Sequence, residues 1–487
     1  MTEGKIKTKE KKPVNIVLIS PPDVDYINAI ETDLLVIDPP IGLAYVASVL
    51  RDNGMDVKII DGNALKLSIE DVVELVANDA PDFVGITVYT FMVEVCAKIA
   101  KGIKEKSQQT KIIFGGPHIH PQHEEVMRMI PFVDYCVIGE GEYPTLELIK
   151  AVNEGNDLTQ VKSIAYRLNG KIIINQQREY LKNLDELPFP ARDLLPFDAY
   201  RSPHSIGGQK PFTLILSSRG CPFACHFCAC NAVWGNQRRR SVENVLDEIE
   251  FVYKKYNIKA IRIEDDLFTL NKKWAIAICR GMVERGLNKI EWETNGRVGT
   301  LSKELLVEMR NANCKSIALG IEFGNQRIID FAEKGLKIDQ VFETVKLIKE
   351  SGIRVKAYFM IGYPTETKET IEDTIKLSQR LDLDYALFSL ATPFPGTRLY
   401  KYVMDKRLLK SNDWKDYRFG SARTCSLDGI SEDDLIKLWN RAGSEFYYRP
   451  KQMLKILRWH PKYVMQLGLK KADRSINNLL KNRMRDR

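Results

Sequence analysis

Short apolar runs alternate with amphipathic stretches over the first third of the chain. In residues 42–52, Leu43, Ala47 and Leu50 fall on one helical face, and Gly54 follows as a stop signal. Alternation of strand and helix at this spacing indicates a parallel sheet covered on both faces. Residues 13–150 are therefore predicted to form a doubly wound, Rossmann-like domain. The expected strands are 15–20, 57–61, 83–87, 111–114 and 135–138, and the expected helices are 42–52, 69–77, 93–106 and 124–129.

The same alternation returns between residues 211 and 410. Six strand–helix units are too few to close an eightfold barrel. Both regions alternate strand and helix, so the chain as a whole is expected to be an α/β protein. The expected strands are 212–216, 260–263, 290–293, 316–321, 354–361 and 385–390, and the expected helices are 241–256, 271–285, 301–311, 338–351 and 367–380.

Three further segments separate or flank these regions. Residues 151–210 contain two short strands joined by Asn169-Gly170, a strong hairpin signal, and then a proline-stiffened stretch, which together predict a connector. Residues 411–487 are expected to be a basic helical segment. The charged residues 1–12 are expected to be a disordered tail.

Composition narrows the class of protein. A chain of 487 residues is too long for one ordinary core, so two or three domains are expected. No apolar run reaches the ~18 residues of a membrane-spanning helix, and the N-terminus lacks the apolar core of a secretion signal. Nine cysteines, an odd number, favour free thiols in a reducing cytoplasm over disulfides. A cytoplasmic protein is therefore expected.

Positive charge is concentrated at the C-terminal end. From Arg441 onward, 13 lysines and arginines outnumber three acidic residues, whereas the whole chain carries a net charge of only +8. Met453, Leu454 and Leu457 interleave with these charges. A basic amphipathic helix is typical of a membrane-surface element, so peripheral contact with a membrane is one interpretation. A helical cap over an active site is another, and nucleic-acid binding is the least favoured.

Candidate chemistry is concentrated in residues 217–228, immediately after the expected strand 212–216. Cys221, Cys225 and Cys228 lie here with three and then two residues between them. Thiolates are strong ligands for iron, and a four-iron cluster normally takes four of them. Three local thiolates would leave one iron open to a small molecule. The loop would lie at the C-terminal end of a buried strand, where α/β folds build their sites.

Two other interpretations of these cysteines are weaker. Zinc usually takes four ligands, often as two separated Cys-x2-Cys pairs, and the chain has no second pair. Cys230 is the local candidate for a fourth ligand. A chance grouping of buried thiols is disfavoured because three of the nine cysteines fall within eight positions. The pattern therefore favours an iron–sulfur cluster.

The loop resembles the signature of the radical S-adenosylmethionine (SAM) enzymes, including the aromatic residue Phe227 before the third cysteine. The resemblance implies that Cys221, Cys225 and Cys228 bind a [4Fe-4S] cluster whose fourth iron is chelated by SAM. It further implies that an electron, supplied by a donor such as flavodoxin or ferredoxin, cleaves SAM to a 5′-deoxyadenosyl radical.

The resemblance implies that residues 211–410 adopt the family's fold, a partial (βα)6 barrel, and the count of six strand–helix units agrees. Motifs at the ends of the later strands resemble this family in the same order. Residues 320–324 are similar to its fourth-strand element, 359–367 to its fifth and 393–397 to its sixth. The acidic turn after strand 260–263 lies where the family contacts the SAM amine, with a solvated turn as the alternative. The resemblance implies SAM contacts from Glu264, Asp265, Asp266, Arg297, Glu322, Gly362 and Glu366.

Small residues follow the strands of the first region, and glycine allows a ligand to approach the backbone closely. The dinucleotide fingerprint G-x-G-x-x-G is absent after strand 15–20, which disfavours a nucleotide. As a set, these loops resemble the cobalamin-binding domain that precedes many radical SAM domains. The resemblance implies cobalamin contacts from Gly42, Thr87, Gly115, Gly116, Gly139 and Gly141.

One departure from that pattern concerns the cobalt ligand. Relatives often carry D-x-H-x-x-G after the first strand, whereas Asp23-Val24-Asp25 stands here without a histidine. Cobalamin is therefore expected to bind without an imidazole from this position. His118, His120 and His123 form a local group, for which a solvated loop is expected and a metal site is the alternative.

Taken together, the resemblance implies a cobalamin-dependent radical SAM enzyme. In relatives the deoxyadenosyl radical removes hydrogen from an unactivated carbon, and methylcobalamin then donates a methyl group. A small hydrophobic or polycyclic substrate is expected, and no catalytic residue is assigned. Radical ring formation without methyl transfer is the alternative activity, and a cobalamin or iron–sulfur sensor is the non-enzymatic one. A methylthiotransferase is disfavoured, because it needs three more N-terminal cysteines and only Cys96 and Cys136 are present.

Overall fold

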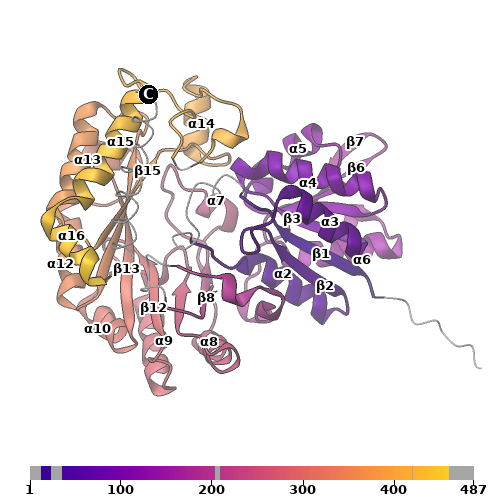
Figure 1. Cartoon of the computed structure of the whole chain (residues 1–487), viewed down its shortest axis with the longest axis horizontal. Coiled ribbons are helices and arrows are strands. Elements are labelled where there is room, and N and C mark those ends of the chain that lie inside the picture. Colours follow the sequence, from indigo (N-terminus) through magenta and orange to yellow (C-terminus); the bar gives the residue numbers. More distant parts are fainter. Residues whose placement is uncertain (1–12, 24–35, 203–208, 419, 460–487) are drawn as a thin grey trace, which may run out of the picture.

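The computed structural model describes residues 13–23, 36–202, 209–418 and 420–459. Two α/β units lie side by side, the first built on the N-terminal sheet and the second on the later strands (Figure 1). The tail predicted at 1–12 and the basic residues 460–487 lie outside the described residues.

The first unit contains a seven-stranded sheet in the order β2-β1-β3-β4-β5-β6-β7. Strands β1 to β5 are parallel, and β6 and β7 add an antiparallel hairpin at one edge, so the hairpin expected in the connector belongs to this sheet. The strand order reverses between β1 and β3, the kind of point at which open α/β sheets bind ligands. The strands are β1 (Asn15–Ser20), β2 (Asp56–Asp61), β3 (Phe83–Thr87), β4 (Lys111–Gly115), β5 (Tyr135–Val137), β6 (Ile164–Leu168) and β7 (Lys171–Ile174).

Helices cover both faces of this sheet because successive side chains of a strand point to opposite sides (Figure 1). Ile16 and Leu18 of β1 pack in one core with α2 and α6, whereas Val17 and Ile19 pack in another with α3, α4 and α5. The helices are α2 (Ile41–Asp52), α3 (Ile69–Asp79), α4 (Val93–Lys106), α5 (Ile119–Met129) and α6 (Glu142–Glu154), with the short 3-10 helix η1 (Thr90–Met92).

The second unit contains six parallel strands in the order β15-β14-β13-β12-β11-β8, which confirms the predicted partial barrel and the α/β class. The strands are β8 (Phe212–Ile215), β11 (Ala260–Ile263), β12 (Glu291–Gly296), β13 (Cys314–Glu322), β14 (Arg354–Ile361) and β15 (Tyr385–Leu390). The helices are α7 (Cys230–Trp234), α8 (Val242–Tyr256), α9 (Lys272–Glu284), α10 (Lys303–Asn311), α11 (Gln326–Phe331), α12 (Ile338–Glu350), α13 (Lys368–Arg380) and α14 (Arg398–Asp405). A two-stranded ribbon, β9 (Ser218–Arg219) with β10 (Arg238–Arg239), lies after β8.

Hydroxyl side chains set where several barrel helices begin. Ser241, Ser302 and Thr367 each accept a hydrogen bond from a backbone N–H in the first turn of α8, α10 and α13. Such caps satisfy donors that the helix itself leaves unpaired. These residues are visible in the sequence, which is why the expected helix starts lie close to the observed ones.

A buried ion network fastens the connector to the barrel. Arg192 and Arg240 both pair with Glu248 of α8, whose side chain is fully buried. The neighbouring Ala191 donates its N–H to the carbonyl of Ala44 on α2. Buried charges persist when they are paired and hydrogen-bonded. The connector, for which the sequence predicts no chemistry, therefore contacts both units and holds them together.

The C-terminal helices protect the free edge of the barrel sheet. The indole N–H of Trp439 donates to the carbonyl of Phe388, and the Tyr447 hydroxyl donates to the carbonyl of Ala386, at 2.7 Å each. These bonds satisfy backbone groups that an edge strand would expose. The elements are α15 (Glu432–Tyr447), α16 (Pro450–Trp459) and the short η7 (Trp414–Asp416).

Helix α16 continues toward the opposite end of the barrel from the cysteine loop, because Gln452 bonds to Asp384 just before β15 begins. Helix α16 therefore does not lie over the carboxyl ends of the barrel strands, whereas Leu435 of α15 packs beside Gly362 at the end of β14. Across the described residues, no helix combines the length and hydrophobicity needed to span a bilayer.

Candidate functional site

The three cysteines of the loop follow β8 directly, as the sequence predicts. Cys225 is buried, Cys221 is half-buried and Cys228 is exposed, and all three are free thiols. Within the described part of the chain, no three His, Cys, Asp or Glu side chains converge on a single point as ligands of one metal ion. A four-iron cluster does not need such convergence, because each iron takes its own thiolate. The donor set fits a cluster better than a single zinc ion.

The start of the loop is held by two carboxylates after β11. Asp265 is buried and accepts four hydrogen bonds of 2.6–3.0 Å from the backbone N–H groups and hydroxyls of Ser217 and Ser218. Burial raises the pKa of Asp265 to about 6. Asp266 accepts the N–H of Gly220 at 3.1 Å. In the acidic turn, therefore, Asp265 is hydrogen-bonded to the loop, and Glu264 forms an ion pair with Arg262.

Gly220 allows the turn into the first cysteine. Its φ of +89° is a conformation that favours glycine. A Cβ here would lie 2.7 Å from the carbonyl oxygens of Gly235 and Asn236. The backbone therefore closes on itself at this point, and Cys221 donates its N–H to the Gly235 carbonyl at 3.1 Å.

An aromatic group supports the other side of the loop. Nδ1 of His226 lies 2.9 Å from the Tyr363 hydroxyl, and its ring meets Phe331 and Tyr402 edge-on. The backbone of His226 bonds to Ala332 as well. Edge-to-face ring pairs contribute beyond the area that they bury. The sequence did not single out these aromatic residues, because they come from separate segments that only folding brings together.

Arg297 follows β12 and contacts the loop. Its guanidinium lies 3.9 Å above the Phe223 ring centroid, and Nη1 lies 3.6 Å from the Cys225 sulfur. Nη2 donates to the carbonyl of Lys334. Arg297 was predicted to contact SAM, but its guanidinium is here engaged with the loop. Hydrogen bonds to the sulfurs are one means of setting a cluster's potential.

Glu322 ends β13 in a strained conformation beside the loop. Its φ of +68° is unusual for a residue with a side chain, and such residues gather at functional sites. Its carboxylate pairs with Lys334 at 3.0 Å, and the Lys334 ammonium lies 5.4 Å from the Phe227 ring centroid. A Cβ on Gly320 would lie 2.4 Å from the Glu322 carboxylate and 2.9 Å from the Lys334 ammonium, so a larger residue there would displace this ion pair. Lys334 was not predicted, because no local motif marks it.

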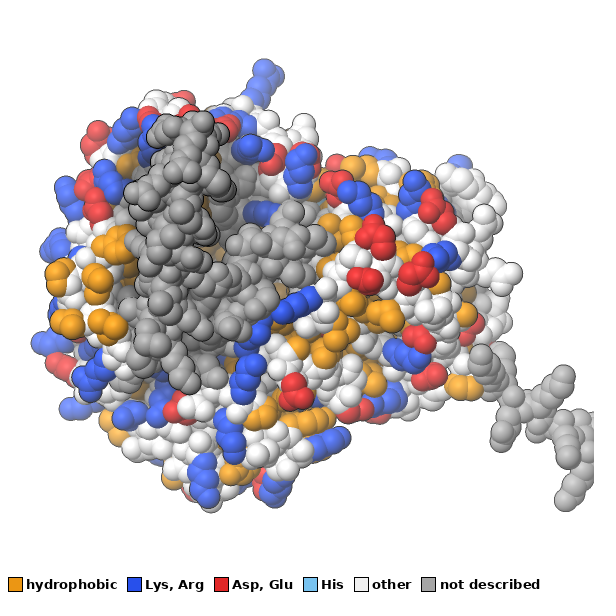
Figure 2. Space-filling model, viewed as in Figure 1, with side chains coloured by type: hydrophobic (Ala, Val, Ile, Leu, Met, Phe, Trp, Pro, Cys, Tyr) orange, Lys and Arg blue, Asp and Glu red, His pale blue; other side chains and the backbone are white. Residues whose placement is uncertain are grey.

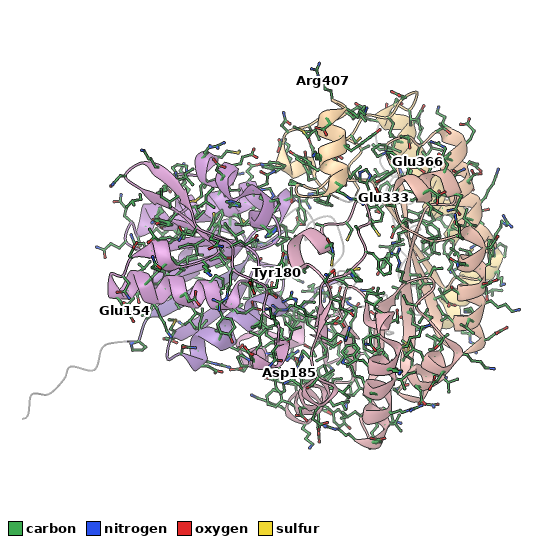
Figure 3. All side chains as sticks on the ribbon, turned by 180° about the vertical axis from the view of Figure 1, so that it is seen from behind. Glu154, Tyr180, Asp185, Glu333, Glu366 and Arg407 are labelled. Atoms are coloured by element: carbon green, nitrogen blue, oxygen red, sulfur yellow. The ribbon has the colours of Figure 1, made fainter. Side chains whose placement is uncertain are left out.

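Glu366 is a buried carboxyl group in the loop after β14. One of its oxygens accepts the N–H groups of Gly362 and Tyr363 at 2.8 and 2.9 Å, and the other has no hydrogen-bond partner. Burial raises the pKa of Glu366 to about 8. Glu366 and Glu333 lie on loops at the same end of the barrel (Figure 3). A cationic ligand would give the free oxygen of Glu366 a partner.

Cys230 lies beside the first of the predicted ligands. A hydrogen bond with its thiol lowers the pKa of Cys221 to about 6. Cys230 opens α7, and its N–H lies 3.4 Å from the Cys228 sulfur. Cys230, the local candidate for a fourth ligand, therefore lies close to the predicted ligands Cys221 and Cys228.

The glycines predicted to contact cobalamin lie at the carboxyl ends of the parallel strands in the first unit. Gly116 has a φ of +98°, and a Cβ there would lie 2.7 Å from the Thr87 hydroxyl, so these two predicted residues are brought together. Among the described residues, a Cβ on Gly42 or Gly115 would meet nothing within 4 Å, so these two positions adjoin open space. A flat ligand could approach the backbone closely there. We call this side of the first unit, with Gly42, Gly115, Gly116, Gly139 and Gly141, the glycine edge.

The expected solvated loop of histidines is not present. Helix α5 begins at Ile119, five residues earlier than expected, and a kink at Gln122, whose backbone angles are not helical, separates its first turn from the remainder. His120 and His123 therefore lie on a helix. His118 is buried, its Nδ1 lies 3.2 Å from the Thr90 hydroxyl, and burial lowers its pKa to about 4. These histidines do not form a metal site with other ligands among the described residues.

The aspartate that follows β1, where relatives often carry the histidine motif, forms an ion pair with an arginine in the C-terminal segment of the chain. Asp23 forms a two-pronged ion pair with Arg418, at 2.8 and 3.1 Å. The Arg418 guanidinium also lies 4.6 Å from the Phe91 ring centroid. The segment after α14 is thereby fastened to the carboxyl end of β1.

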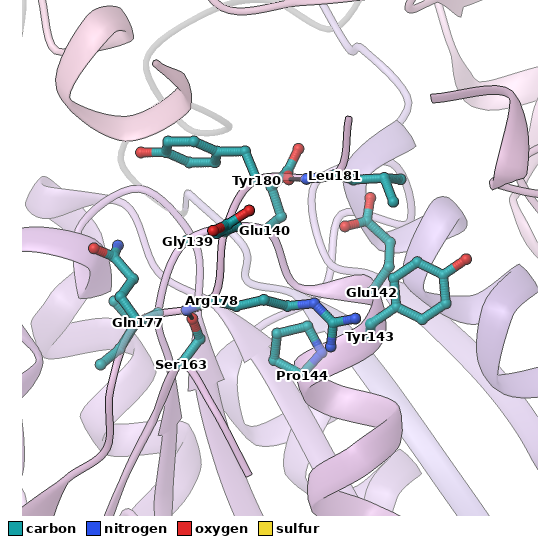
Figure 4. A pocket seen from close by; sticks show the side chains of 12 residues that line it. Gly139, Glu140, Glu142, Tyr143, Pro144, Ser163, Gln177, Arg178, Tyr180 and Leu181 are labelled. Atoms are coloured by element: carbon teal, nitrogen blue, oxygen red, sulfur yellow. Dashed lines mark hydrogen bonds between the residues drawn. The ribbon is translucent and has the colours of Figure 1, made fainter. Parts of the chain in front are cut away.

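A small hollow lies behind the loop that follows β5. It is lined by this loop and by connector residues, and its volume of about 20 Å³ suits one water molecule (Figure 4). A corrin ring is far larger. This hollow is therefore too small to hold cobalamin. The lining residues are Ile138, Gly139, Glu140, Glu142, Tyr143, Pro144, Ser163, Gln177, Arg178, Glu179, Tyr180 and Leu181.

Comparison with known proteins agrees with both units. Residues 33–149 match the B12 binding domain, and residues 215–378 match the radical SAM superfamily. An uncharacterized methyltransferase of Pyrococcus horikoshii is 36% identical over 94% of this chain and 98% of its own. The anaerobic magnesium-protoporphyrin IX monomethyl ester cyclase of Rubrivivax gelatinosus is 30% identical over 78% of this chain and 69% of its own.

Solved structures share the fold. The radical SAM methyltransferase TsrM of Kitasatospora setae, with tryptophan and a SAM analogue bound, superposes with a TM-score of 0.68 over 90% of both chains, at 19% identity. The cobalamin-dependent radical enzyme OxsB, with aqua-cobalamin and SAM bound, has a TM-score of 0.65 over 84% of this chain and 57% of its own, also at 19% identity.

Proposed function

Because this chain belongs to the radical SAM enzymes that carry a B12-binding domain, we propose that it is a cobalamin-dependent methyltransferase. When bound, the cluster, SAM and cobalamin would together supply a 5′-deoxyadenosyl radical and a methyl group for an unactivated carbon. Cys221, Cys225 and Cys228 would hold the cluster. The proposal rests on a B12-binding domain and a radical SAM domain being present in one chain.

The observation that carries the proposal is the position of the cysteine loop next to the glycine edge. Arg219, two residues before Cys221, bonds to Glu140 and Glu142 on either side of Gly141. Asp23 and Arg418 join the same two units at the end of β1. A substrate bound between the units would therefore meet both cofactors, which methyl transfer to a carbon radical requires.

The residues around the loop have distinct proposed roles. Asp266 and Glu322 lie beside the cysteines and would meet the ammonium of SAM, a charge-assisted contact. Glu366 and Gly362 would meet the rest of SAM, and the unpartnered oxygen of Glu366 suits a cation or a hydroxyl. Asp265 and Arg297, predicted as SAM contacts, would act through the loop that they hold.

Anaerobic reconstitution with SAM labelled in its methyl group tests this function without knowledge of the substrate. We expect absorbance of an iron–sulfur cluster and of bound cobalamin, formation of 5′-deoxyadenosine under reducing conditions, and the label on cobalamin. A protein that forms no 5′-deoxyadenosine would be a sensor. A protein that forms it without ever labelling cobalamin would be an oxidative ring-forming enzyme.

Ring formation without methyl transfer is the second candidate activity, because a relative at 30% identity is named a magnesium-protoporphyrin IX monomethyl ester cyclase. Both activities begin with the same radical, so the cysteine loop cannot distinguish them. The labelled methyl group does, because a cyclase leaves it on SAM-derived methionine. For either activity we propose a small hydrophobic or polycyclic substrate and a flavodoxin or ferredoxin as electron donor.

We further propose a cytoplasmic protein with peripheral membrane contact through α16. Leu454 is 68% exposed, and Met453 and Leu457 are exposed with it. Lysines and arginines border this edge of the molecule (Figure 2). Apolar side chains beside basic ones suit an anionic lipid surface. Flotation with anionic and neutral vesicles tests this: binding to anionic vesicles that Leu454→Glu abolishes is expected, and no binding to either would refute it.

A further inference from the structure

A four-residue ion network joins the cysteine loop to the glycine edge. Nη1 of Arg219 lies 3.0 Å from Oε1 of Glu140, and its Nη2 lies 2.5 Å from Oε1 of Glu142. Nη1 of Arg238 lies 3.0 and 3.1 Å from the two oxygens of Glu140. Two positive and two negative charges thus balance one another. We call Arg219, Arg238, Glu140 and Glu142 the bridging network.

The bridging network is shielded from solvent. Its side chains are between 7% and 14% exposed, so water screens these pairs far less than it screens surface pairs. The Arg219 guanidinium lies 5.3 Å from the ring of Tyr45 on α2, and the Arg238 guanidinium lies 5.0 Å from the ring of Tyr180. Aromatic faces of this kind attract guanidinium groups. The geometry of all four side chains is therefore well defined.

Backbone contacts make the bridging network rigid on both sides. Arg219 and Arg238 face each other in the antiparallel ribbon of β9 and β10. On the other side, Glu140 accepts the N–H of Leu181, and the Leu181 carbonyl accepts from Arg238. Figure 4 shows Glu140 and Glu142 projecting from the loop after β5, with Tyr180 and Leu181 beside them. Figure 3 shows Tyr180 between the two units.

The position of these residues in the sequence links both cofactor sites. Glu140 and Glu142 flank Gly141, a predicted cobalamin contact, and Arg219 precedes Gly220 and the first cysteine. A displacement of the glycine loop must therefore move Arg219, or break its ion pairs. None of the four side chains is needed to ligate iron.

We propose that the bridging network positions the cysteine loop against the cobalamin loop and so sets the separation of the two cofactors. This inference rests on the proposed function, because it requires both cofactors. Glu140 is then a positioning residue, which acts through Arg219 and Arg238. The fold does not depend on it alone, since the connector network of Arg192 and Glu248 also joins the units.

The test is EPR spectroscopy of the full-length holoprotein with reduced cluster and cob(II)alamin. Two paramagnetic centres broaden and split each other's signals, and this effect falls steeply with their separation. In the parent protein we expect a defined splitting of the cobalt signal. Glu140→Gln removes the negative charge and replaces one acceptor oxygen by an NH2 donor, which cannot accept from Arg238 or from the Leu181 N–H. In this variant we expect the splitting to shrink or spread while iron and cobalamin contents stay unchanged.

Glu147→Gln is the matched control. Glu147 lies on α6 soon after Glu142 and forms an ion pair with Arg178, but both side chains are about 40% exposed. Its spectrum should equal that of the parent protein. A parent-like splitting in Glu140→Gln would overturn the inference, and so would an equal change in both variants.

If Glu140→Gln fails to retain a cofactor, the same EPR measurement on Arg238→Lys tests the inference instead. Lysine keeps the charge but has a single nitrogen, so it cannot bond to Glu140 and also make the bond that Nη2 of Arg238 donates to the Trp234 carbonyl. An altered splitting in this variant supports the inference, and a parent-like splitting overturns it. Absence of any cobalt signal in the parent protein would instead refute the proposed function, and the inference with it.

Discussion

The cysteine loop and the glycine edge are built in opposite ways. Around the cysteine loop, side chains from several strand ends supply contacts: Asp265 accepts four hydrogen bonds, and Arg297 and His226 bond to further partners. At the glycine edge the important property is the absence of side chains, because Gly42 and Gly115 adjoin open space. One site is defined by bonds and the other by the room that it leaves.

This difference reflects what each site would bind. A small cluster reaches the chain only through a few sulfur atoms, so the loop that carries them must be held rigidly by other groups. A corrin presents a broad flat surface, which backbone can approach closely only where side chains are missing. Substitutions should therefore affect stability at the cysteine loop and ligand affinity at the glycine edge.

The largest effect is expected from Cys225→Ala. Removing a buried ligand should reduce bound iron from about four atoms per chain to near zero and abolish formation of 5′-deoxyadenosine. Cobalamin binding should persist, because the glycine edge lies on the other unit. Iron analysis and cobalamin absorbance after anaerobic reconstitution check both points. Cys425→Ala, at a buried free thiol in the C-terminal segment, should keep both cofactors; iron retained by Cys225→Ala would refute the assignment.

The next effect is expected from Asp265→Ala. It leaves the buried N–H groups of Ser217 and Ser218 without acceptors, at a cost of about 2–5 kcal/mol in the free energy of unfolding. Asp265→Asn is the control, because its amide oxygen still accepts both N–H groups and the two hydroxyls can rotate to accept instead of donate. Denaturant unfolding should show a loss in the alanine variant and a small change in the asparagine variant. Equal losses would contradict this role of the carboxylate.

Glu366 gives a pH dependence. Burial raises its pKa from 4.5 to about 8 in the folded, SAM-free protein, so folding favours its protonated form. Stability from this group is full below about pH 4.5 and is lost as the pH rises to about 8. Glu366→Gln stays neutral and should avoid a loss on the order of 3 kcal/mol between about pH 5 and pH 8.5. Denaturant unfolding of the parent protein and of Glu366→Gln across this pH range tests the prediction. If the free energies of unfolding of the two proteins changed in parallel with pH, Glu366 would not be protonated in the folded protein.

The smallest effect on the fold is expected at the glycine edge. Gly115→Ala should change the free energy of unfolding by less than about 0.5 kcal/mol, because its Cβ meets no atom, yet it should weaken cobalamin binding about tenfold, or about 1.4 kcal/mol. Gly443→Ala, which also meets nothing within 4 Å but lies on α15, should change neither. Unaltered cobalamin affinity in Gly115→Ala would place the corrin elsewhere.

More of the fold than of the candidate site could be predicted from the sequence. The strands and most helices follow from local periodicity and capping residues such as Ser241. Helix α5 was placed too late, because the apolar pattern is weak around His120 and Pro121. Arg297 and Asp265 were found as polar residues at strand ends, but their partners were not, since a strand end does not specify which loop folds over it.

The chain by itself determined two parallel α/β units, a three-cysteine loop after the strand that opens the second, and glycines along one edge of the first. These follow from spacing and periodicity, which are local properties of a polypeptide. Only the tertiary structure decided that Glu140 meets Arg219, 79 residues away, and that Asp23 meets Arg418, 395 residues away. Ion pairs of this kind depend on how two units pack together, and a carboxylate in a loop does not reveal in advance which distant guanidinium will reach it.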